Sequence, residues 1–218
     1  MAPVASFAEV EGLLGIVVII SALYLQGQSF VDPTIRGISA QSFVISAIFV
    51  ILYLQSGDMD LVYLAIVTAI VRGILIPNVM LYQVRRFKHS LRETGMGLRI
   101  PSLVIMGVVI VIAGYGLYKT VLLSVLPNSL VAVPLVLILL SFLLIATRRN
   151  ALMQMTGFLQ EENGVLYAGA LITPSIPLLI EFAVVLDILG VVLVGVILSG
   201  TRDVLRTLEA PELEQLTG

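Results

Sequence analysis

Long runs of apolar residues, separated by short polar breaks, dominate the chain. A helix that crosses a hydrocarbon layer of about 30 Å needs about 20 mostly apolar residues. The runs are too long and too uniformly apolar for the alternating strands of a membrane barrel. The pattern predicts an all-α, polytopic membrane helix bundle with about seven transmembrane helices, at residues 8–26, 38–55, 61–82, 101–123, 129–147, 151–172 and 177–199.

The breaks between these runs contain residues that disfavour a continuing helix. A stretch from 27 to 37, which holds Asp32 and Pro33, separates the first two runs, and residues 55–58 close the second. Pro127 begins a turn, and so does the segment 174–177, because proline has no N–H and a fixed φ. We therefore expect tight turns at these two proline segments.

Composition agrees with a lipid environment. Of the 218 residues, 59% are hydrophobic and 12% are charged, and the mean hydropathy is +1.09. A water-soluble domain carries about twice that share of charge. The composition excludes an ordinary soluble enzyme, a disordered chain and a nucleic-acid binder. With no cysteine and one histidine, His89, the chain lacks the ligands of iron–sulfur clusters, so redox chemistry must belong to another chain.

The basic residues predict the orientation. Ten of the 12 lysines and arginines fall in connections that seven spans place on one side, which the positive-inside rule makes cytoplasmic. The opposite connections carry only acids, namely Glu9, Glu11, Asp58 and Asp60. The N-terminus is thus predicted outside and the C-terminus in the cytoplasm. The basic loops are interpreted as a topology signal in contact with anionic membrane lipids.

A few ionisable residues fall inside the predicted spans, where each costs about 2.5–3.5 kcal/mol at a helix centre. Lys119 lies near the outer end of its span and is expected to reach the interface. The others are candidates for a proton or ion pathway: Arg72, Glu161, Glu162, Glu181 and Asp187.

Counting along each span places Arg72, Glu162 and Asp187 near the middle of the bilayer, on three different helices. Glu181 lies about 9 Å nearer the outside than Asp187. One interpretation is a buried ion pair that fixes helix register. It accounts for Arg72 and one acid, whereas a polar path through the membrane accounts for all of them. Pro77, five residues after Arg72, frees a backbone carbonyl one turn back, which commonly lets a helix bend or become hydrated locally.

Several motifs resemble a known group of membrane subunits. Arg149-Asn150, Gly157 and Asn163 match the spacing in the K-type subunit of complex I and the C subunit of multi-subunit sodium/proton antiporters, which are three-helix proteins. Glu162 lies three residues beyond the usual position of the acid, on nearly the same helix face.

Over essentially its full length, the chain is similar to component E of hydrogenase-4, a membrane subunit of formate hydrogenlyase-type group 4 hydrogenases. The matching elements are residues 72–77, Arg149-Asn150, Gly157, residues 162–164, Pro177 with Glu181 and Asp187, and the tail at 208–218. The family more often has lysine at the position of Arg72. Arginine does not release its proton, so Arg72 is expected to act through its field. Glu161 is additional to the family's usual acid.

The resemblance implies a non-catalytic subunit of a multi-subunit oxidoreductase in a prokaryotic cell membrane. Its implied partners are antiporter-like membrane subunits and a hydrogenase-type peripheral arm, which would hold a nickel–iron site and iron–sulfur clusters; no cofactor, metal or nucleic acid is expected on this chain. It also implies three regions: a four-helix membrane region at 1–128, a K-type-like region at 129–199 and a cytoplasmic tail at 200–218.

Three alternatives stay open. The chain could serve a related multi-subunit cation/proton antiporter, or act as a stand-alone secondary transporter, although no convincing inverted repeat is visible. It could also be a structural anchor that docks redox subunits to the membrane.

Overall fold

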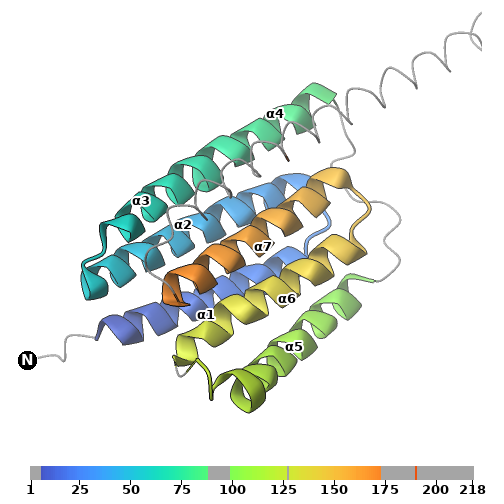
Figure 1. Cartoon of the computed structure of the whole chain (residues 1–218). Helices are drawn as coiled ribbons and strands as arrows, with labels where there is room; N and C mark the ends of the chain where they lie inside the picture. Colours follow the sequence, from blue (N-terminus) through green and yellow to red (C-terminus); the bar gives the residue numbers. More distant parts are fainter. Residues whose placement is uncertain (1–5, 88–98, 127, 173–189, 191–218) are drawn as a thin grey trace, which may run out of the picture.

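The computed structural model describes residues 6–87, 99–126, 128–172 and 190 (Figure 1). Every regular element in these ranges is a helix, and none is a strand. Five helical stretches are long and apolar enough to cross a membrane: Glu9–Gln26, Val31–Ser56, Met59–Arg85, Ile100–Leu122 and Ser129–Thr147. The chain is therefore a helical membrane protein.

Four helices form the centre of the bundle. They are α1 (Phe7–Gln26), α2 (Val31–Ser56), α6 (Ala132–Thr147) and α7 (Ala151–Ile172). Helix α1 contacts α2 and α6, and α7 contacts the same two helices, so the four close into a ring in cross-section. The predicted regions 1–128 and 129–199 thus pack directly against each other.

Two longer stretches flank this centre on opposite sides (Figure 1). One stretch, against α2, consists of α3 (Met59–Val67), the π-helix η1 (Thr68–Leu75) and α4 (Ile76–Phe87). The other, against α6 and α1, consists of α5 (Ile100–Leu117) and the π-helical turn η2 (Tyr118–Leu122). A short 3-10 turn, η3 (Ser129–Val131), leads into α6.

Helix α7 matches the predicted span 151–172 but is more polar than the other helices. Its 22 residues can cover about 33 Å, enough for a hydrocarbon layer. It is absent from the five apolar stretches, because it contains two glutamates, two glutamines and an asparagine. Its neighbours α6 and α2 cover much of its surface.

The predicted break between the first two helices is too long. Helix α2 begins at Val31, so Asp32 and Pro33 form its first turn instead of interrupting the chain. Proline fits there because the first N–H groups of a helix have no intrahelical acceptor. The carboxylate of Asp32 favours the same end through the helix dipole. The true connection is the short segment 27–30.

The helix is irregular directly before Pro77. Directly before it, η1 has π-helical hydrogen bonding, and the Ile76 N–H donates to the Val71 carbonyl five residues back. Proline has no N–H for the Gly73 carbonyl, which accepts a hydrogen bond from the Ser39 hydroxyl of α2 instead. Short π-helical segments often mark functional sites. This one carries Arg72.

The seventh predicted span, 177–199, and the tail, 200–218, lie outside the described residues except for Gly190. The predicted orientation and the count of seven stay predictions.

Two glycines of α7 allow close contact with α6. A Cβ on Gly157 would lie 2.7 Å from the Ile145 side chain, and one on Gly164 would lie 2.7 Å from Ile138 and 3.3 Å from the Pro134 carbonyl oxygen. Small residues at such crossings let helix backbones approach in membranes.

We expect Gly164→Leu to destabilise the bundle by on the order of 1–3 kcal/mol, because the larger side chain forces α7 away from α6. The measurement is the folded fraction in detergent after heating, followed by size-exclusion chromatography. Gly116→Leu is the matched control, since a Cβ at that position of α5 meets nothing within 4 Å. Equal thermal stability of both variants would contradict the close packing of α6 and α7.

Candidate functional site: a buried charge pair and a polar helix face

Arg72 and Glu162 form an ion pair inside the bundle. Arg72 Nη2 lies 3.1 Å from Glu162 Oε2, and the two side chains are 3% and 20% exposed. Arg72 Nη1 also donates to Asn163 Oδ1 at 3.2 Å. The guanidinium thus binds two adjacent residues of α7 at once.

Asn163 connects this pair to α2. Its Nδ2 donates to Ser42 Oγ at 3.0 Å, and the Ser42 hydroxyl donates to the Ile38 carbonyl one turn back, also at 3.0 Å. Asn163 and Ser42 are buried. We call Arg72, Glu162, Asn163 and Ser42 the central polar cluster. It joins η1, α2 and α7 near the middle of each helical stretch.

The structure brings together some of the predicted site residues. Arg72 and Glu162 are in direct contact, as the ion-pair interpretation requires. Glu161 is half-buried beside them and interacts electrostatically with Arg72. Lys119 is exposed in η2 near the end of its helical stretch, as expected. Glu181 and Asp187 lie outside the described residues.

A polar face of α7 was not predicted from the sequence, where the charged residues inside the spans were the candidates. Thr156, Gln160, Asn163 and Tyr167 are each fully buried. Their spacing of four, three and four residues places them on one helix face. Both amide atoms of Gln160 lack a hydrogen-bond partner among the described residues. The signal was available as polar residues at helical spacing in an otherwise apolar run.

Glu11 was assigned wrongly to an outer connection. It lies within α1 and is 1% exposed. Its Oε1 is 3.5 Å from the Tyr167 hydroxyl of α7, and its Oε2 is 3.5 Å from Gln55 Nε2 of α2. Its position in α1 faces the centre of the ring, whereas Glu9, two residues earlier, is exposed and caps the helix with Ser6.

Arg148, at the other end of the bundle, has a structural contact in addition to its place in the predicted orientation signal. It is 2% exposed, and its Nη2 donates to the carbonyl oxygens of Leu25 at 3.3 Å and Gln26 at 2.7 Å. The last carbonyls of a helix have no intrahelical donor, so the guanidinium caps α1. The Gln26 amide in turn donates to the Leu140 carbonyl of α6 at 2.7 Å.

These features define a class: a helical membrane protein whose bundle encloses polar groups at both ends and a charge pair in between. Among known proteins, the chain is 22% identical over 185 residues to "Uncharacterized protein Rv0085" of Mycobacterium tuberculosis. The alignment covers 84% of each chain. No family model and no solved structure matches the chain.

We expect Arg72→Gln to destabilise the protein, because Glu162 then loses its cation. Removing one partner of a fully buried pair costs about 3–5 kcal/mol, and the partial exposure of Glu162 lowers this. The double variant Arg72→Gln with Glu162→Gln should recover part of the loss, as read from thermal unfolding in detergent. Lys119→Gln, which removes an exposed cation, is the control and should have little effect. A double variant no more stable than Arg72→Gln would show that the two charges are not coupled.

Proposed function

We propose that the chain is a non-catalytic membrane subunit of a complex I-like, group 4 hydrogenase-type complex that translocates ions. In this role its intramembrane carboxylates contribute to a proton or sodium pathway, while the redox chemistry takes place on other subunits. The pathway residues we propose are Glu162, Glu161, Arg72, Glu181 and Asp187.

The observation that carries this proposal is the contact of Arg72 with Glu162 and Asn163. These residues are 90 and 91 positions apart in the sequence. They also belong to the motifs that resemble component E of hydrogenase-4 and, for Asn163, the K-type subunit. Two of the stretches that carry the resemblance, residues 72–77 and 162–164, thus meet in one cluster inside the bundle.

The chemistry of the central polar cluster suits a site that responds to charge. Arginine keeps its proton in proteins, so Arg72 supplies a fixed positive charge. Glu162 can gain or lose a proton, and a bound proton neutralises the carboxylate while Arg72 keeps its positive charge. Asn163 is neutral and holds the guanidinium in either state, so the cluster can change charge without losing all its hydrogen bonds. Such intramembrane carboxylates commonly serve proton and ion routes.

The partial exposure of Glu162 adds a second argument. Its side chain is 20% exposed, whereas that of Arg72 is 3% exposed. The carboxylate therefore lies at the edge of the cluster, where a neighbouring membrane subunit can reach it. An antiporter-like partner packed against this side would be able to exchange ions with Glu162 directly.

Purification from a native source in gentle detergent should recover the chain together with a hydrogenase large subunit and antiporter-like membrane proteins, identified by mass spectrometry. Recovery with antiporter-like proteins but no hydrogenase subunit would favour the related cation/proton antiporter instead. A chain that migrates alone, and transports ions alone in liposomes, would contradict both and favour a stand-alone transporter.

Within the intact complex, Glu162→Gln should lower ion pumping into vesicles several-fold, because the amide cannot exchange a proton. Redox activity measured with a soluble electron acceptor should change little, since the redox centres are expected on the peripheral arm. Glu9→Gln, at an exposed position that keeps its capping role, is the matched control. Normal pumping by Glu162→Gln would leave the Arg72–Glu162 pair with a structural role only.

A further inference from the structure

Glu11 is a buried carboxyl group whose partners are neutral. The Tyr167 hydroxyl and the Gln55 amide lie at 3.5 Å, one on each oxygen. Among the described residues, no lysine or arginine pairs with it. Charged carboxylates are costly to bury without a cation, and such a group commonly takes up a proton instead. This environment differs from that of Glu162, which has Arg72 beside it.

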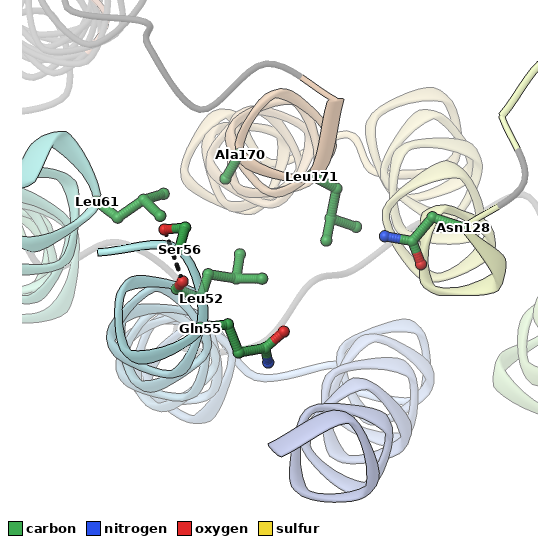
Figure 2. Close-up of a pocket in the computed structure, with 7 residues that line it drawn as sticks. All are labelled: Leu52, Gln55, Ser56, Leu61, Asn128, Ala170 and Leu171. Carbon is green, nitrogen blue, oxygen red and sulfur yellow. Dashed lines mark hydrogen bonds between the residues drawn. The ribbon is translucent and has the colours of Figure 1, made fainter. Parts of the chain in front are cut away.

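A cavity of about 200 Å³ lies at the end of the bundle opposite Arg148, and one of its lining residues, Gln55, donates to Glu11. Its wall includes Gln55 and Ser56 at the end of α2, and Asn128 before η3 (Figure 2). The rest of the wall comes from leucines of α2, α3 and α7 and from Ala170. Figure 2 shows the Gln55 side chain between α2 and α1, away from the apolar part of the wall. Gln55 therefore contacts both the cavity and the buried carboxyl group.

We propose that Glu11 is a proton-binding site that exchanges protons with the solution through this cavity. The Gln55 amide lines the cavity and contacts one carboxylate oxygen, and the Tyr167 hydroxyl contacts the other. Hydrogen bonds from these two donors stabilise the carboxylate after the proton leaves. The proton returns to the same carboxylate oxygens, so the exchange needs no other reactant. By the predicted orientation, this end of the bundle faces the outside.

The site also has a connection toward the centre of the bundle. Tyr167 is the member of the buried polar face of α7 nearest to Glu11. Asn163 lies four residues before it in the sequence, about 6 Å away along the helix axis. Asn163 holds Arg72, which pairs with Glu162. If the proposed function holds, Glu11 is the outer end of the same proton route. Proton binding by Glu11 itself does not depend on that function.

Among the described residues, few titratable groups lie around Glu11. Tyr167 is the titratable group that faces it from α7, and Tyr115 of α5 interacts with Tyr167. Gln55 faces it from α2 and does not titrate. On its own helix, Glu9 lies at the exposed end, bonded to Ser6.

Infrared difference spectra between acidic and basic pH, recorded on the full-length chain in lipid vesicles, test the site. The native protein should show a carboxylic C=O band that Glu11→Gln removes and Glu9→Gln keeps. Tyr167→Phe should retain the band but shift its frequency, because the carboxyl group loses a hydrogen-bond partner. Two results would overturn the proposal. One is a pH-dependent band that is unchanged in both Glu11→Gln and Tyr167→Phe. The other is a band whose intensity changes with sodium concentration and not with pH.

The route through the cavity has its own test, because the chain contains no cysteine. Ser56→Cys, labelled with a bulky maleimide, should slow the protonation of Glu11 after a pH jump several-fold. Ser124→Cys, exposed near the same end of the bundle, is the control and should leave the rate unchanged when labelled. Equal rates in both labelled proteins would contradict entry through the cavity.

A measurement of ion pumping distinguishes failure of the proposed site from failure of the proposed function. If Glu11→Gln removes the band and also lowers pumping in the intact complex, both the site and its connection to Glu162 are supported. If the band is lost while pumping stays normal, Glu11 binds a proton but its connection to the central cluster is wrong.

Discussion

The structure depends on one constraint: a polar group inside an apolar bundle must find its partner within the protein, because lipid offers none. Arg72 shows the consequence most clearly. Its guanidinium holds α7 through Glu162 and Asn163, and Asn163 in turn holds α2 through Ser42. Pro77 has no N–H for the Gly73 carbonyl, and α2 supplies the hydroxyl of Ser39 for it. Three helices are thus fixed in register by groups that would be costly to separate.

Helix α7 is the organising element of the bundle. Its glycines allow close packing against α6, while another face carries polar side chains from Thr156 to Tyr167. Such a face would be unfavourable against lipid, so the ring of α1, α2 and α6 covers it. The two ends of this face differ in character. One meets a carboxyl group with neutral partners, Glu11, and the other lies toward the end capped by the cation Arg148.

Much of the fold could be predicted from hydrophobic length alone. The first, fourth, fifth and sixth predicted spans lie within about one residue of the helical stretches observed. Counting residues also placed Arg72 and Glu162 at the same level of the bundle, because a helix has a fixed rise per residue, and the two side chains are in contact. The burial of Glu11 could not be predicted from the sequence. A polar residue near a helix end has the same sequence signature whether it faces water or the bundle, and the difference depends on which helices pack around it. The early start of α2 was missed for a local reason, since Pro33 ends one helix as readily as it begins another.

The central proposal is an ion pathway through the polar residues of α7, which include Glu162, instead of a purely structural contact. Its most direct test is the access of silver ions, which bind thiolates and are small cations, to single cysteines in the otherwise cysteine-free chain. Gln160 and Leu159 are neighbours in α7, and their exposed fractions are 0% and 1%. The account predicts that Gln160→Cys reacts with silver ions from solution while Leu159→Cys does not. Equal reaction, or no reaction at either position, would contradict it.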